Sequence, residues 1–123
     1  IGYKTKNFPG FYLTASGFQI EYQADSADQI ASAIKARASM KTNTSALIVA
    51  NPVKNQMDKK LHDSILVSGL ASAEKEGITG KAVTPFLLEH FHTESKGDSL
   101  RVNIEIIKSN CALAADIAVA LNK

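Results

Sequence analysis

Two asparagines lie on the apolar side of the last helical stretch of this 123-residue chain. Asn103 falls between Leu100 and Ile107 on a stripe of apolar residues, and Asn110 falls on the same side. A side-chain amide on a buried face must find hydrogen-bond partners, because an unpaired one costs about 1–3 kcal/mol. Asn103 therefore either closes a structural hydrogen-bond network or lines a ligand pocket, and its position alone favours neither.

A lysine precedes a predicted helix start in the stretch GITGKAVTPFLLEHF, residues 77–91. Thr84 is expected to cap this helix and Pro85 to fill its first turn, where a missing amide proton costs nothing. The free amides and the dipole of a helix start favour an anion, and Lys81 lies just upstream. The stretch is not a P-loop, since the four-residue spacer and the Ser or Thr after the lysine are missing. A solvated lysine in a turn is therefore the preferred interpretation, and an anion site is the alternative.

Another candidate ligand group follows an apolar stretch in the first half of the chain. Asn51 and Pro52 come directly after ALIVA, residues 46–50. In α/β proteins, ligand-binding loops lie at the carboxyl ends of such strands. A plain turn is the slightly preferred interpretation for this pair.

The histidines and the cysteine form no pattern of metal ligands. His90 and His92 are two residues apart and point to different sides of a helix, and His62 is isolated. The single cysteine, Cys111, excludes an internal disulfide, and its apolar helical surroundings predict an inert buried thiol. We therefore expect no tight manganese site within this chain.

Composition limits the classes of protein to which the chain can belong. With 123 residues, 45% of them hydrophobic, it fits one domain or part of one. Its net charge of +2 comes from 14 basic and 12 acidic residues without a block of either sign, which gives no reason to expect a nucleic-acid partner or an anionic membrane surface. No apolar run approaches the roughly 20 residues that span a bilayer, and no signal peptide is visible, so a cytoplasmic location is expected. The chain begins inside a predicted strand, which indicates a fragment.

Strands and helices alternate in the first half of the chain. We predict a strand at residues 1–3, a loop at 4–16 and a short half-buried strand at 19–23. A helix then runs to about residue 41, with Asp25 and Ser26 supplying oxygens for its first amides. The continuous apolar run at 46–50 is typical of a strand that is covered on both faces, as in a parallel or mixed sheet.

The second half is predicted to be mostly helical. Asp58 caps a helix that ends at Gly77 and carries an apolar stripe of Leu61, Ile65, Leu66 and Leu70. The helix that Thr84 caps follows. A long helix then starts near Asp98 and Ser99. Its predicted buried stripe is Leu100, Ile104, Ile107, Cys111, Ala114, Ala118 and Leu121.

Four segments of the chain carry a family resemblance. They are GYKTKNFPGFY at 2–12, VANP at 49–52, GKAVTPFLL at 80–88, and SL followed by NI within 99–104. In this order and spacing they resemble the pseudouridine-5'-phosphate glycosidase family, also called the indigoidine synthase A-like family. The resemblance covers roughly the last two-fifths of such an enzyme. It implies an α/β fold in which residues 1–123 form a single C-terminal segment of a three-layer α/β/α architecture with a mixed sheet.

The resemblance also implies a reaction. Members of the family reversibly cleave pseudouridine 5'-phosphate to uracil and ribose 5-phosphate, as homotrimers with a divalent metal, typically manganese. The bond is carbon–carbon, so a leaving oxygen or nitrogen cannot be protonated as in ordinary glycoside hydrolysis. The family is understood to open the ribose ring and form a Schiff base with a lysine, whose iminium accepts the electrons of the breaking bond. A carboxylate moves protons, and the metal helps to organise the phosphate-bearing site.

Few of the family's functional residues fall within this chain. By the resemblance, the catalytic lysine, the proton-transferring glutamate and the metal-site aspartate all lie upstream of Ile1. Asn103 matches the asparagine that faces the substrate, as a hydrogen-bonding group for the sugar or the base. Lys81 and Thr84 match the family without a role. The chain departs from the family pattern at Gly10, Ser45-Ala46 and Ser109-Asn110-Cys111, where alanine, a glycine pair and Asn-Asn-Ala are usual.

Three hypotheses follow, in order of preference. The chain is the C-terminal part of a glycosidase, in which case its sheet has too few strands to close a core. Alternatively, it is an independent sugar-phosphate-binding module with a complete core and a pocket around Asn103. The third hypothesis makes it a structural or assembly module in which Asn103 bonds only to protein groups. Apolar faces left open at residues 46–50 and on the last helix would favour the first hypothesis.

Overall fold

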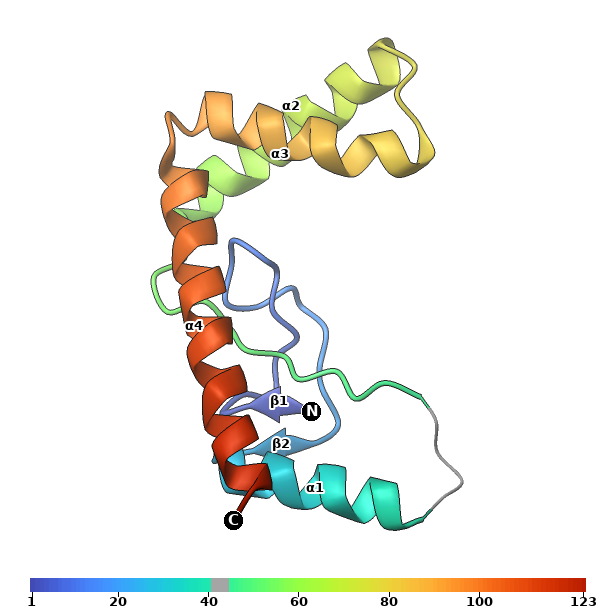
Figure 1. The fold of residues 1–123 in the computed structure, drawn as a ribbon. Coiled ribbons are helices and arrows are strands. Elements are labelled where there is room, and N and C mark those ends of the chain that lie inside the picture. The colour runs from blue at the N-terminus through green and yellow to red at the C-terminus, as the bar shows by residue number, and fades with distance from the viewer. Residues whose placement is uncertain (41–44) are drawn as a thin grey trace. The chain divides into compact units, whose positions relative to one another are not determined.

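The computed structural model describes residues 1–40 and 45–123, which divide into two compact units (Figure 1). The first unit comprises Ile1–Lys54 and Glu105–Lys123, and the second comprises Asn55–Ile104. None of the described helices is long and apolar enough to cross a membrane. That residues 1–123 form a single segment of a larger domain stays a prediction.

A small parallel sheet lies at the centre of the first unit. Strand β1 (Gly2–Tyr3) pairs with β2 (Gln23–Ala24), and Gly2 lies opposite Gln23 in the register. The strand predicted at residues 1–3 is therefore confirmed. The one predicted at 19–23 is right only at its end, because Gln19 makes an isolated antiparallel bridge to Asn7 instead.

The apolar segment 46–50 lies along the other side of β1 but is not the doubly covered strand that its composition predicts. It forms an isolated parallel bridge between Ala50 and Gly2. Val49 is half-buried, whereas the side chain of Ile48 is 71% exposed. The prediction of a strand covered on both faces is wrong for the described residues, because they supply packing partners on one face only.

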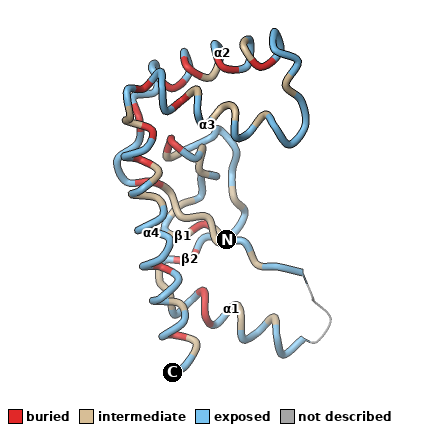
Figure 2. The backbone as a smooth tube through the Cα atoms, turned by 45° about the horizontal axis from the view of Figure 1, so that its top comes forward, coloured by how far each residue is buried: buried red, intermediate tan, exposed pale blue. Residues whose placement is uncertain are grey.

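One helix and the end of another close the core of the first unit. Helix α1 (Ala27–Ser39) begins where Ser26 Oγ accepts a hydrogen bond from the Gln29 amide, which confirms the predicted cap for Ser26. The Asp25 carboxylate accepts from Gln23 Nε2 instead of from a helix amide. The last helix, α4 (Asp98–Leu121), contributes Leu113 to the core. Figure 2 colours the backbone by burial, with buried residues in red on α1 and α4. The core consists of Ala24, Ile30 and Leu113, and against it pack Ile1, Tyr3, Ile34, Val49 and Ile117.

The second unit is a helical hairpin. Helix α2 (Lys59–Lys75) packs against α3 (Val83–Glu94), and a short 3-10 helix, η1 (Gly80–Ala82), precedes α3. Asp58 caps α2 by accepting from the Leu61 amide at 2.9 Å, as predicted. Gly77 has a φ of +66° just beyond the end of α2, which confirms its predicted position.

The buried face of α2 differs from the predicted leucine stripe. The buried residues are His62, Ile65, Gly69 and Ala73. Leu61 and Leu70 are exposed instead. A Cβ built on Gly69 would lie 2.9 Å from the side chains of His90 and Leu87, so α3 packs closely against this face. Small residues therefore decide which side of α2 is buried, and the leucines do not.

Helix α3 starts differently from the prediction. Its N-cap is Ala82, and no described side chain caps it; Thr84 lies in the first turn and is exposed. The 3-10 turn explains this start, because the Ala82 and Val83 amides donate to the carbonyls of Thr79 and Gly80. Thr84 therefore lies inside the helix and not at its N-cap, and that prediction is wrong.

Helix α4 buries a different side from the predicted one. Its buried residues are Ser99, Val102, Leu113 and Ala120. In contrast, Leu100, Ile104 and Ile107 are exposed, the last with 58% of its side chain accessible. Cys111 is an exposed free cysteine, so the predicted buried thiol is wrong. The helix carries two apolar stripes, and only the one that meets neighbouring described elements is covered.

Candidate functional site

A polar cluster joins the end of segment 46–50 to helix α4 in the first unit. Asn51 Nδ2 donates to Ser109 Oγ at 2.9 Å and to Asn110 Oδ1 at 3.0 Å. The backbone of the preceding residue is fixed by β1, because the Ala50 amide donates to the Ile1 carbonyl at 2.8 Å. Asn51 therefore ties the carboxyl end of this segment to α4, at the position where the sequence predicts a ligand loop or a turn.

The Asn51 side chain retains hydrogen-bonding capacity. Both donor bonds of its Nδ2 are used within the protein, and no described residue donates to its Oδ1. Ser109 is half-buried and Asn110 is exposed. The cluster therefore combines an ordered amide with accessible acceptor and hydroxyl groups, which suits hydrogen bonding to a polar ligand more than proton transfer.

Asn103 belongs to the second unit and is not part of this cluster. It is half-buried on α4 beside the fully buried Val102. Its side-chain amide makes no hydrogen bond to any described residue. The structural network that the sequence allows for Asn103 is thus not formed by the described part of the chain, and its role in a ligand pocket stays a prediction.

The lysine turn before α3 also lies in the second unit. Lys81 is exposed in η1, and its ammonium group bonds to no described side chain. Gly80, with a φ of +59°, makes the turn possible. This geometry fits the preferred interpretation of a solvated lysine in a tight turn.

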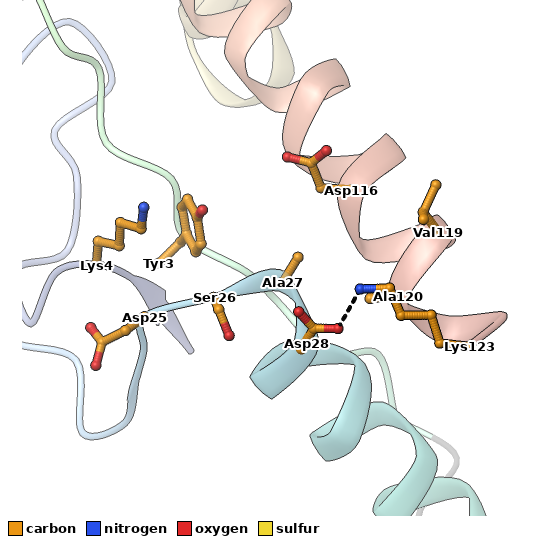
Figure 3. Close-up of a pocket in the computed structure, with 10 residues that line it drawn as sticks. All are labelled: Tyr3, Lys4, Asp25, Ser26, Ala27, Asp28, Asp116, Val119, Ala120 and Lys123. Atoms are coloured by element: carbon orange, nitrogen blue, oxygen red, sulfur yellow. Dashed lines mark hydrogen bonds and ion pairs between the residues drawn. The ribbon is translucent and has the colours of Figure 1, made fainter.

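A charged cleft of about 340 Å³ lies in the first unit, at a place that the sequence does not single out (Figure 3). Groups of both signs surround it, and one pair is in contact: Lys123 Nζ lies 3.0 Å from Asp28 Oδ1. The ammonium group of Lys4 lies 5.1 Å from the centroid of the Tyr3 ring. The residues that line the cleft are Tyr3, Lys4, Asp25, Ser26, Ala27, Asp28, Asp116, Val119, Ala120 and Lys123.

A second hollow, of about 240 Å³, lies between α2 and α3. His90 lines this hollow, and its Nε2 lies 2.8 Å from Ser68 Oγ. The His90 ring is stacked on the Phe86 ring, with 6.2 Å between the ring centroids. Several glutamates lie nearby. However, within residues 1–40 and 45–123 no three His, Cys, Asp or Glu side chains are placed to hold a metal ion. The donor groups described here therefore do not fit the manganese site that the family resemblance implies.

The sequence as a whole matches a known family. Residues 1–120 fit the family model described as indigoidine synthase A like protein. The chain belongs to this family. The resemblance seen in the four sequence segments is therefore confirmed.

Curated members of the indigoidine synthase A-like family show how much of such a protein the chain represents. A pseudouridine-5'-phosphate glycosidase of Salinispora tropica is 51% identical over 122 residues, which cover 98% of this chain and 38% of that protein. A second, from Frankia alni, is 48% identical and is covered to 34%. A third, from Geobacillus kaustophilus, is 40% identical and is covered to 41%. The chain thus spans about two-fifths or less of the length of these relatives.

A solved structure supports the fold. The chain resembles the prealnumycin C-glycosynthase AlnA, solved in complex with ribulose 5-phosphate, with a TM-score of 0.84 over 98% of this chain and 40% of that one. The two are 21% identical, so the comparison speaks for the fold. The predicted α/β class is confirmed, and residues 1–40 and 45–123 are mostly helical with a two-stranded sheet.

Proposed function

We propose that this chain is the C-terminal part of an enzyme that reversibly cleaves the carbon–carbon glycosidic bond of pseudouridine 5'-phosphate to uracil and ribose 5-phosphate. The observation that carries this proposal is the match to relatives named for that activity, which spans 98% of the chain at 51% identity in the Salinispora tropica protein. The chain alone lacks the catalytic lysine in this proposal and is inactive.

The complete enzyme must supply what these residues do not. Cleavage of a carbon–carbon bond needs an electron sink, which a lysine Schiff base provides. We assign that lysine, the proton-transferring glutamate and the metal ligands to the remaining part of the enzyme. By family resemblance, the whole is a cytoplasmic, manganese-dependent homotrimer with a three-layer α/β/α architecture.

The chain's own contribution is substrate binding. In this proposal, the Asn103 amide hydrogen-bonds the sugar or the base, and it is half-buried without a hydrogen bond to the described residues. Burial strengthens such a bond, because water competes less well for the amide. The Asn51 cluster holds the neighbouring part of α4 in place from within the first unit.

A chimeric enzyme tests the proposal. The 122 residues of the Salinispora tropica relative that match this chain are replaced by the chain itself, and release of uracil from pseudouridine 5'-phosphate is measured with manganese present. We expect the chimera to cleave the substrate and the 123-residue chain alone to be inactive. A folded chimera without activity would contradict the proposed function, as would cleavage by the isolated chain.

The role of Asn103 is tested in the same chimera. Loss of one substrate hydrogen bond of about 1–3 kcal/mol lowers kcat/KM roughly 5- to 150-fold, and we expect Asn103→Ala to fall in this range. Asn122→Ala serves as the control, because the Asn122 amide bonds only to the Ala118 carbonyl of its own helix. Equal kcat/KM values for the two variants would show that Asn103 does not bind the substrate.

A sugar-phosphate-binding module without catalysis is the second candidate. The observation in its favour is that the structurally similar AlnA was solved with ribulose 5-phosphate. This candidate predicts that the isolated chain binds ribose 5-phosphate, with heat measurable by titration calorimetry. The glycosidase proposal predicts no such heat from the isolated chain.

A further inference from the structure

The Asn51 cluster, which consists of Asn51, Ser109 and Asn110, leaves a definite set of hydrogen-bonding groups unused. Asn51 Nδ2 spends both of its hydrogens inside the cluster, one on Ser109 Oγ at 2.9 Å and one on Asn110 Oδ1 at 3.0 Å. A side-chain amide has two donor hydrogens and one acceptor oxygen. Asn51 Oδ1 therefore remains as an acceptor, to which no described residue donates.

The two partners of Asn51 keep groups of the opposite kind. Ser109 Oγ accepts the bond from Asn51, so its own hydroxyl proton is still available as a donor. Asn110 accepts through Oδ1, so its Nδ2 keeps both hydrogens. Neither residue donates to any part of the chain that the structure describes. The cluster thus offers donors on two side chains and an acceptor on the third.

The backbone holds these groups in place from both sides. The Ala50 amide donates to the Ile1 carbonyl, and the Tyr3 amide donates to the Ala50 carbonyl, both at 2.8 Å. Ser109 and Asn110 lie in the interior of the long helix α4. Groups that are ordered before binding lose less conformational freedom when a ligand arrives. The cluster is therefore suited to recognise a ligand whose donors and acceptors match its own.

We propose that the Asn51 cluster binds the uracil base of pseudouridine 5'-phosphate. The imide edge of uracil carries one N–H between two carbonyl oxygens, which is one donor and two acceptors. Asn51 Oδ1 accepts from the imide N–H, while the Ser109 hydroxyl and the Asn110 amide donate to the carbonyl oxygens. The inference rests on the proposed function, and it adds which part of the substrate these residues recognise.

Charge distinguishes uracil from the other half of the substrate, ribose 5-phosphate. No member of the cluster is charged. Phosphate is recognised by arginine, lysine or the free amides of a helix start, and its ionised oxygens would meet the acceptor of Asn51 without a cation beside it. Sugar hydroxyls can donate and accept, so the ribose is the other possible occupant. The Michaelis constants of the two halves tell them apart.

Asn110→Asp tests the proposal with little change in shape. The carboxylate keeps an oxygen for the bond from Asn51 but replaces the free Nδ2 donor by a second acceptor. In the chimeric enzyme, run in the direction of synthesis, KM is measured separately for uracil and for ribose 5-phosphate. We expect KM for uracil to rise about tenfold or more, since a carbonyl oxygen then faces an acceptor, and KM for ribose 5-phosphate to change by less than about twofold.

Asn122→Asp is the matched control. It makes the same chemical change at an amide that bonds only to the Ala118 carbonyl of its own helix. We expect both KM values of this variant to stay within about twofold of those of the unsubstituted chimera, because Asn122 offers nothing to the base.

A second pair of variants keeps the test independent of Asn110. Ser109→Ala removes the hydroxyl donor and should raise KM for uracil about fivefold or more. Ser109→Thr retains a hydroxyl and should return KM for uracil to within about twofold of the original value. Damage to folding would raise both KM values or lower kcat alone, whereas loss of a bond to the base raises KM for uracil and is rescued by threonine.

Specific results would overturn the inference. They are an unchanged KM for uracil in Asn110→Asp and Ser109→Ala, an equal rise of both KM values, or the same rise in Asn122→Asp. A rise confined to KM for ribose 5-phosphate would assign the cluster to the sugar instead. An active chimera with any of these results contradicts this inference alone, while a folded chimera without activity contradicts the proposed function on which it rests.

Discussion

Individual polar side chains in this chain hold together segments that are distant in sequence. Asn51 is the clearest case, since one amide bonds to two residues that are 58 and 59 positions away. Each bond between neutral groups contributes about 1 kcal/mol to stability when it is shielded from water.

We expect Asn51→Ala to lower the free energy of unfolding by about 1 kcal/mol, mainly through loss of the partly buried bond to Ser109, since the bond to Asn110 is exposed. Urea denaturation followed by circular dichroism measures this loss. Asn122→Ala is the matched control, with one bond in an exposed helix end and an expected change below about 0.5 kcal/mol. If the two variants were equally stable, the cluster would contribute nothing to the first unit.

At this scale, the sequence predicts residues with local roles better than residues with distant partners. Ser26 and Asp58 cap their helices as expected, because a cap is decided within three or four residues. The partners of Asn51 lie on another element, so no local pattern indicates them. Thr84 fails as a cap even though its motif is local, because the preceding 3-10 turn leads into a helix that already begins at Val83.

The helices show that packing depends on small residues as much as on large ones. Helix α2 buries Gly69 and Ala73 and leaves two leucines exposed, since the absence of a Cβ at Gly69 lets α3 approach. A search for apolar stripes gives leucines more weight than glycines, so it finds the buried Ile65 but also selects the exposed Leu61 and Leu70.

We expect Gly69→Val to lower the free energy of unfolding by about 1–3 kcal/mol, because the added side chain must displace Leu87 and His90. Ala71→Val on the exposed side of α2 is the control and costs only the lower helix propensity of valine, about 0.5 kcal/mol. Urea denaturation compares the two. A Gly69 variant as stable as the Ala71 variant would mean that the helices do not pack closely at this point.

Helix α4 shows the same ambiguity along two apolar stripes. Leu113→Ala should lower the free energy of unfolding by about 2–4 kcal/mol, since the side chain lies in the core with Ala24 and Ile30. Ile107→Ala should change stability by less than about 0.5 kcal/mol, because the residue is largely exposed in this chain. Equal losses in urea denaturation would show that the predicted stripe is buried after all. The sequence contains both stripes, and only the neighbouring elements determine which one is covered.

At the scale of the whole molecule, the partial coverage of the relatives and the exposed apolar side chains both support the proposal that this chain is part of a larger enzyme. The chain covers at most 41% of the three relatives described above, and it exposes large apolar side chains at Ile48 and along α4. The α/β class is predictable from the alternation of elements. The three-layer architecture is not predictable in this way, because the described residues form a two-stranded sheet, and that architecture stays a proposal.

We expect the isolated chain to self-associate most near pH 8.7, its isoelectric point, where net charge no longer opposes contact between apolar surfaces. As the pH falls to about 6, the chain becomes more positive and association should decrease. Light scattering at constant ionic strength measures this trend. Association that stays constant over this range would mean that charge repulsion does not control it.

The two stripes of α4 have an evolutionary consequence. A helix with a single buried face leaves more than half of its positions free to change by drift. If the second apolar stripe is also covered in the complete protein, only the residues of α4 that lie on neither stripe can be substituted without loss of packing. A library of single substitutions selected in the full-length enzyme should then be depleted at Leu100, Ile104 and Ile107 as strongly as at Val102 and Leu113, although the two groups differ in exposure here.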